Sequence, residues 1–139
     1  MFLVVDINVV LSALIGRGNS SIIFELNAEK KMFRFIAPQF ILIEAGKHLV
    51  EIARRSALPM EEIAEDINFI KEQITFISEE DYDDKNDEAR KILRNHEKDV
   101  PYLALALKYN CKIFSGDKTL KAIIPDKVLT PKEMLESFG

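Results

Sequence analysis

The sequence has a single cysteine, only two histidines and no long apolar segment. Because Cys111 has no partner, an internal disulfide is excluded, which suits a reducing compartment. No apolar run approaches the roughly 20 residues that a membrane-spanning helix needs. The apolar start is interrupted by Asp6 and no basic residues precede it, so it predicts a strand rather than a signal peptide. We therefore expect a cytoplasmic protein without a membrane segment.

The composition is that of an ordinary globular protein. Of the 139 residues, 47% are hydrophobic and 30% are charged, which excludes a disordered or fibrous chain. This length is enough to bury a core without disulfides or metal clips. We find no internal repeat, linker or low-complexity stretch, so we expect one domain over residues 1–139.

The charge is unevenly distributed along the chain. The formal net charge is −4, but residues 61–88 hold 12 acidic side chains and only two lysines, so the remaining chain is net positive. Divalent cations bound there would make that part attractive to a phosphate backbone. The alternative is a solvated acidic helix and loop beside ordinary surface lysines. The same choice applies to Lys118 and Lys121, which either contact phosphates or are simply solvated.

Short apolar runs alternate with amphipathic stretches, a pattern typical of an α/β fold with a mainly parallel sheet. The predicted strands are Phe2–Val5, Phe33–Ala37, Ile74–Ile77, Lys112–Ser115 and Lys127–Leu129. The predicted helices are Ile7–Leu14, Ser20–Lys30, Pro38–Arg55, Met60–Gln73, Asp83–Asn95, Val100–Tyr109 and a last one that begins at the capping box Thr130–Glu133. Gly16 and Gly18 are expected to stop the first helix, and Asn19 or Ser20 to cap the second.

Three aspartates stand where strands end or helices begin. Asp6 and Asp117 follow predicted strands, at the edge where open α/β sheets place their ligand sites. Asp99 precedes a strongly apolar helix with Pro101 in its first turn. Each of the three, taken alone, is also explained as a helix N-cap. A cap and a metal ligand are compatible roles.

Glu44 is different, because it interrupts the apolar run 40–45 of a predicted helix. We expect this helix segment to pack on the sheet, and a buried carboxylate needs a cation or hydrogen bonds. The alternative is a boundary position at which Glu44 pairs with Lys47 or His48. Together the four acids form a set of hard oxygen ligands, which favours Mg²⁺ or Mn²⁺ over zinc.

These residues, in this order, resemble the PIN (PilT N-terminal) family. The matching pieces are Val4–Val10, Pro38–Glu44, Asp99–Ala106, Ser115–Lys118 and Leu129–Pro131. The resemblance implies a three-layer α/β/α sandwich with a mainly parallel sheet of four or five strands. It also implies that Asp6, Glu44, Asp99 and Asp117 hold one or two Mg²⁺ or Mn²⁺ ions. Asn8 and Ser115 would orient those ligands.

The family resemblance implies an endoribonuclease that hydrolyses phosphodiester bonds of RNA. It further implies a role as the toxin of a toxin–antitoxin pair, with an antitoxin protein as partner and a homodimer as the expected assembly. One departure is the long, acidic stretch between Glu44 and Asp99, unlike the more compact toxins of the family. The alternative is a catalytically weak PIN-fold module that binds RNA or a protein partner. A haloacid-dehalogenase-type phosphatase is disfavoured, because Asn8 occupies the place of its second aspartate.

Overall fold

A parallel five-stranded sheet forms the centre of the computed structural model, which describes residues 1–15 and 18–139. The strands lie in the order β3-β2-β1-β4-β5, and every neighbouring pair is parallel. Their bounds are β1 Phe2–Val5, β2 Arg34–Pro38, β3 Ile74–Ile77, β4 Lys112–Phe114 and β5 Val128–Leu129. The order reverses between β1 and β4, so the carboxyl ends of these two strands flank the point where α/β folds bind ligands.

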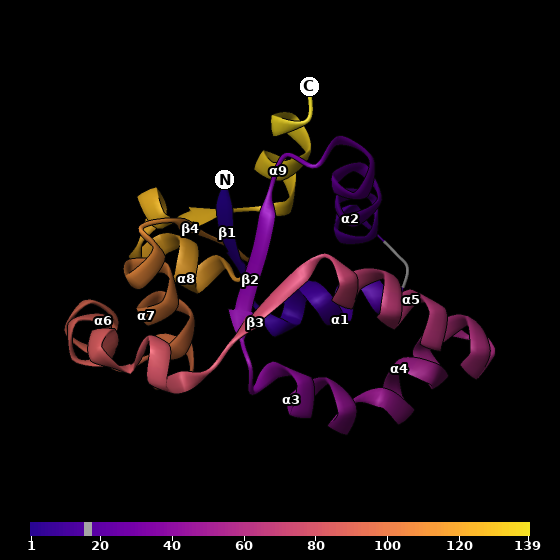
Figure 1. Ribbon diagram of the computed structural model, residues 1–139, viewed down its shortest axis with the longest axis horizontal. Helices are drawn as coiled ribbons and strands as arrows, with labels where there is room; N and C mark the ends of the chain where they lie inside the picture. The colour runs from indigo at the N-terminus through magenta and orange to yellow at the C-terminus, as the bar shows by residue number, and fades with distance from the viewer. Residues whose placement is uncertain (16–17) are drawn as a thin grey trace.

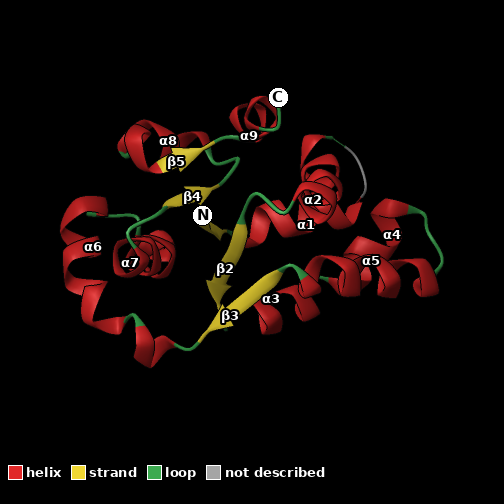
Figure 2. Cartoon of the chain, turned by 45° about the horizontal axis from the view of Figure 1, so that its top comes forward, coloured by secondary structure: helices red, strands yellow, loops and turns green. Residues whose placement is uncertain are grey.

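Helices cover both faces of this sheet (Figures 1 and 2). The α-helices of the described residues are α1 Ile7–Ile15, α2 Asn19–Lys30, α3 Ile41–Lys47, α4 Leu49–Ser56, α5 Met60–Glu72, α6 Asn86–Leu93, α7 Val100–Tyr109, α8 Lys118–Ile123 and α9 Pro131–Ser137. Single 3₁₀ turns occupy Glu79–Asp81 (η1), Asp83–Lys85 (η2), Glu97–Asp99 (η3) and Pro125–Lys127 (η4). Helix α7 contacts β1, β2 and β4 on one face, with α6 packed outside it. Helices α1 and α2 contact each other, α3, α4 and α5 contact α1, and α9 contacts α2.

The strands alternate their side chains between the two layers, as the pleat requires. In the β1–β2 register Leu3 pairs with Phe35, and in the β1–β4 register Val5 pairs with Phe114, so these four side chains share one face. Phe24 of α2 packs on that face, with ring centroids 5.2 Å from Phe35 and 6.5 Å from Phe114. Burial of each such ring contributes roughly 1.5–3 kcal/mol. The predicted α/β/α sandwich with a parallel sheet is therefore confirmed.

Several element bounds differ from the sequence prediction. The single helix expected from Pro38 to Arg55 is wrong: Pro38 still pairs with Ile77 in the sheet, and α3 starts only at Ile41. The chain then breaks at His48, whose backbone (φ −95°, ψ 2°) ends α3 and starts α4. The cap expected from Asn19 or Ser20 is absent: α2 starts after Gly18, whose φ of 101° lies in the region that favours glycine, and no side chain caps the helix. The helix stop expected at Gly16 lies outside the described residues.

Local signals near the end of the chain are confirmed. Thr130 accepts a hydrogen bond from the backbone N–H of Glu133, and Glu133 accepts one from the backbone N–H of Thr130, at 3.2 and 3.0 Å. Helix α7 spans the predicted residues and ends at Asn110 in the left-handed conformation, with φ 50°. In the described part of the chain no single helix combines the length and the apolar character needed to cross a bilayer; only the bent pair α1–α2 meets a test of length and composition.

Candidate active site

Asp6 lies directly after β1, where its backbone N–H donates to the carbonyl of Phe114 at 3.3 Å. Its side chain is only 5% exposed. One carboxylate oxygen, Oδ1, accepts from the backbone N–H of Val9 at 3.1 Å, which caps α1. The other, Oδ2, accepts a short hydrogen bond from the hydroxyl of Ser115. The cap expected from the sequence is present and occupies only one of the two oxygens.

Burial raises the pKa of Asp6 above its ordinary value. Hydrogen bonds from Ser115 and from nearby backbone N–H groups oppose this rise, and the negative charge of Asp117 adds to it. The carboxylate is thus held in place by its donors while its ionised form is destabilised. A cation beside it would remove that penalty.

Asp99 is the last residue of η3 and stands at the N-cap position of α7. The capping role that the sequence left open for Asp99 is absent, because its side chain accepts no hydrogen bond from the helix. Its backbone is already helical (φ −91°, ψ −7°), so the carboxylate is not presented to the N–H groups of the first turn. The residue is 9% exposed. Burial, followed by the charge of Asp117, raises the pKa of Asp99, and Asp6 contributes in the same direction.

Asp117 caps α8, as the sequence predicts for it. Its Oδ1 accepts from the backbone N–H groups of Thr119 and Leu120, at 2.8 and 3.1 Å. Its own N–H donates to the hydroxyl oxygen of Ser115 at 3.1 Å. Ser115 is fully buried, and its backbone N–H donates to the carbonyl of Leu129 at 3.1 Å. Ser115 therefore connects Asp6 and Asp117 from a position fixed by the sheet.

Glu44 does not occupy the buried position expected from its apolar neighbours. Helix α3 buries only Ile41, whereas Ile43 is 66% exposed, because the helix lies at the margin of the fold. The Glu44 side chain is 44% exposed, and its Oε1 lies 3.2 Å from Nζ of Lys47. This is the surface pairing that the sequence left open as the alternative. His48 lies 3.9 Å from Glu51 instead of pairing with Glu44.

A cleft of about 370 Å³ nevertheless brings several of the predicted residues together. Asp6, Asn8, Glu44 and Asp99 all line it. Asn8 is exposed, and within the described residues its side chain makes no hydrogen bond to a carboxylate. Asp117 does not line the cleft but lies close enough for its charge to raise the pKa values of Asp6 and Asp99.

Sequence reasoning missed Tyr102, which lines the same cleft from the first turns of α7. Its hydroxyl oxygen accepts from the backbone N–H of Ile7 at 3.3 Å and so ties α7 to the start of α1. Burial raises the pKa of Tyr102, and the charges of Asp6 and Asp99 add to the rise. A tyrosine inside an otherwise apolar helix was the only signal in the sequence, and such a residue is usually core.

A comparison with protein families identifies the family of this chain. The family model described as PIN domain matches residues 4–127. The chain belongs to the PIN domain family. PIN domains are in general nucleases that act on nucleic acids and use divalent metal ions. A search of curated protein sequences gave no match.

The donor set of this PIN domain fits a hard divalent cation, because it consists of carboxylates, two of them buried, on the carboxyl side of the sheet. As the side chains stand, however, no three acidic, histidine or cysteine residues in the described part of the chain are grouped closely enough to hold an ion. The roles of Asp6, Glu44, Asp99 and Asp117 as ligands stay predictions, as do those of Asn8 and Ser115.

Proposed function

We propose that this PIN domain is an endoribonuclease that depends on Mg²⁺ or Mn²⁺. The observation that carries the proposal is the pair Asp6 and Asp99, two buried residues whose carboxylates line one cleft. The pKa of each is raised by burial and by the charge of Asp117, and Asp6 further raises the pKa of Asp99. Such an arrangement is unfavourable for stability alone, and active sites are where proteins keep it. A bound divalent ion would provide the compensating charge.

Each residue of the site has a distinct part in this proposal. Asp6, Asp99 and Asp117 would hold the ion, and Glu44, after leaving Lys47, would hold it or a water molecule bound to it. Ser115 would keep the carboxylate of Asp6 oriented. When bound, the ion supplies an activated water and neutralises charge on the departing oxygen in phosphodiester hydrolysis.

Lysines near the cleft suggest how the phosphate backbone is held. Lys98 lines the cleft and Lys118 is exposed at the start of α8. Lys121 is engaged elsewhere: its Nζ donates to the carbonyl of Val128 at 2.8 Å and lies 3.0 Å from Glu133. We therefore assign phosphate contacts to Lys98 and Lys118, and a structural role to Lys121.

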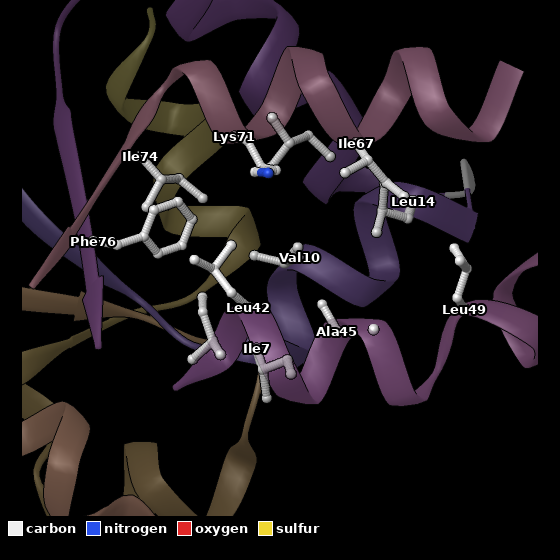
Figure 3. Close-up of a pocket in the computed structure, with 13 residues that line it drawn as sticks. Ile7, Val10, Leu14, Leu42, Ala45, Leu49, Ile67, Lys71, Ile74 and Phe76 are labelled. Carbon is white, nitrogen blue, oxygen red and sulfur yellow. The ribbon is translucent and has the colours of Figure 1, made fainter. Parts of the chain in front are cut away.

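A role as the toxin of a toxin–antitoxin pair belongs to the same proposal. An apolar cavity of about 160 Å³ lies between α1, α3, α5 and β3, where the side chains of Val10, Leu42 and Ile67 converge (Figure 3). Lys71 also lines it and has no salt bridge to a described residue. An antitoxin segment with apolar anchors and one acidic residue would complement this cavity. We also propose that the protein forms a homodimer and acts in the cytoplasm.

The other candidate function is a PIN module that binds RNA or a protein without cleaving. What favours it is that no three ligands are ready-grouped among residues 1–15 and 18–139. The deciding experiment is cleavage of a mixed single-stranded RNA with Mn²⁺, compared between the wild type and Asp6→Asn. The nuclease proposal expects cleavage that needs Mn²⁺ and falls at least about 100-fold in the variant. Equal cleavage by both proteins would overturn it.

A further inference from the structure

A second hollow adjoins the carboxylate cleft. Its volume is about 480 Å³, and its lining residues include Phe40, Ile43, Tyr82 and Pro101. Phe40 and Pro101 also line the carboxylate cleft, so these two residues form the wall between the two spaces. A molecule bound at the carboxylates therefore has this hollow as its immediate neighbour.

The hollow also lies at the carboxyl edge of the sheet. The backbone N–H of Gln39, just after β2, donates to the carbonyl of Ile77 at the end of β3, at 2.8 Å. This bond holds the segments that carry Phe40 and Glu79 side by side. The hollow is thus built on strand ends, where ligands of open α/β sheets bind.

The lining chemistry suits a flat, uncharged group. Among the residues that the structure describes, no lysine or arginine lines the hollow and Glu79 is its only charged residue, so a phosphate would be repelled. Phe40 and Tyr82 supply aromatic rings. Tyr82 is 4% exposed, and its hydroxyl makes no hydrogen bond to any residue the structure describes. This hydroxyl oxygen remains accessible to solvent, so water or the polar edge of a ligand can bond it.

We propose that this hollow binds one unpaired nucleobase of the RNA, on the nucleotide next to the phosphate held at the carboxylates. This inference rests on the proposed nuclease function. A nucleobase has apolar faces that stack on aromatic rings and a polar edge that Tyr82 and Gln39 can bond. Phe40 is the stacking and positioning residue, and the substrate must be single-stranded here, because a base within a duplex cannot enter the hollow.

The charged residues around the hollow indicate the path that the RNA strand would take. Glu79 and Tyr82, which line the hollow, belong to or adjoin the acid-rich turns η1 and η2, whereas Lys98 lines the carboxylate cleft and not the hollow. Phosphates would therefore lie along the Lys98 side, and the base would point toward Tyr82. Phe40 also contacts Tyr102 edge-on, with ring centroids 5.8 Å apart, so a base stacked on Phe40 is coupled to the carboxylate cleft.

The chain contains no tryptophan, which makes a direct optical test available. Phe40→Trp, made together with Asp6→Asn to prevent cleavage, places a single tryptophan at the wall of the hollow, which can be excited at wavelengths that the three tyrosines do not absorb. Titration with a single-stranded RNA should quench its emission. The matched control carries Phe69→Trp with Asp6→Asn; Phe69 is 39% exposed on α5 and lines neither space. No quenching is expected in the control.

A second measurement uses the RNA rather than the protein. Replacing the nucleotide next to the cleavage position by an abasic one should weaken binding by roughly 5- to 150-fold, the effect of one lost base–aromatic stack. The Phe40→Leu variant should bind the intact and the abasic RNA equally weakly. The Phe40→Tyr variant should again bind the intact RNA more tightly than the abasic one. In cleavage assays Phe40→Leu should raise KM more than it changes kcat.

The outcomes separate this inference from the function on which it rests. Cleavage by the wild type without quenching of Phe40→Trp would overturn the nucleobase site and leave the hollow to a protein segment. Equal binding of the intact and abasic RNAs by the wild type would also overturn it. Quenching without any Mn²⁺-dependent cleavage would support the nucleobase site and overturn the nuclease proposal.

Discussion

Ser115 donates a hydrogen bond from its hydroxyl group to Oδ2 of Asp6, across 109 positions of sequence. The same hydroxyl oxygen accepts from the backbone N–H of Asp117 at 3.1 Å. One buried side chain at the end of β4 therefore orients the carboxylate at the end of β1 and positions the start of α8. It also lowers the pKa of Asp6, against the effect of burial.

Removing that hydroxyl should weaken metal binding without unfolding the protein. We expect Ser115→Ala to lower the affinity for Mn²⁺ by roughly 10- to 100-fold, the usual effect of losing a group that orients a ligand. Isothermal titration calorimetry at pH 7 measures it. Ser137→Ala is the control, because Ser137 is exposed and bonds only the carbonyl of Glu133 at 3.0 Å. Equal affinities of Ser115→Ala and the wild type would contradict the role.

We expect the Asp99 carboxylate to lower the stability of the folded protein when no metal is bound. Its carboxylate is buried, makes no capping bond and is repelled by Asp117 and Asp6. Asp99→Asn should therefore stabilise the metal-free protein at neutral pH by on the order of 1 kcal/mol after solvent screening, or roughly 3 °C in Tm. Differential scanning calorimetry with a chelator tests this. Asp126→Asn, at an exposed position, should change little. A less stable Asp99→Asn would refute the expectation.

A substitution at Glu44 tests whether this residue is a functional carboxylate or only one partner of a surface ion pair. The Glu44–Lys47 pair has side chains 44% and 66% exposed and contributes about 0–1 kcal/mol. Glu44→Gln should therefore leave Tm nearly unchanged while lowering Mn²⁺-dependent cleavage at least about tenfold. Glu51→Gln serves as the control, since its side chain is 52% exposed and lies 3.9 Å from Arg55. Wild-type cleavage by Glu44→Gln would assign Glu44 to the surface alone.

Glu133 should give the last helix a stability that depends on pH. The backbone N–H of Thr130 and then Lys121 lower the pKa of Glu133 from 4.5 to about 2. Because its folded-state pKa is depressed, this stabilisation is present above pH 4.5 and is lost as the pH falls toward 2. The difference in Tm between the wild type and Glu133→Gln should be positive at pH 7 and should shrink across that window. A difference that is constant with pH would contradict the assignment.

Elements fixed by local interactions were predictable from the sequence. The capping box of Thr130 and Glu133 involves residues three apart, and the α7 helix follows from its apolar run and Pro101. The parallel sheet followed from apolar runs alternating with helices. Asp6 and Asp117 could be placed near strand ends for the same reason: Asp6 follows β1 directly, and Asp117 follows β4 after Ser115 and Gly116.

Features set by tertiary position were not predictable. The burial of Glu44 was misjudged because an apolar helix can lie at the margin of a fold, where Ile43 remains exposed. Whether Asp99 caps its helix could not be decided from the sequence, because the helical backbone at this residue, which turns the side chain away from the first turn, leaves no local signal. The break at His48 comes two residues after Gly46, a glycine whose weak helix propensity the sequence prediction did not use. The hydrogen bond from the backbone N–H of Ile7 to the hydroxyl oxygen of Tyr102 joins two segments that lie 95 positions apart in the sequence.

Convergence of the carboxylates on one ion is tested most directly by a crystal structure grown with Mn²⁺ and recorded with anomalous scattering. We expect an anomalous peak at the cleft, about 2.1–2.2 Å from carboxylate oxygens of Asp6 and Asp99, with Asp117 or Glu44 moved inward to complete the coordination. A fully ordered site without an anomalous peak, or a peak only elsewhere on the molecule, would contradict it.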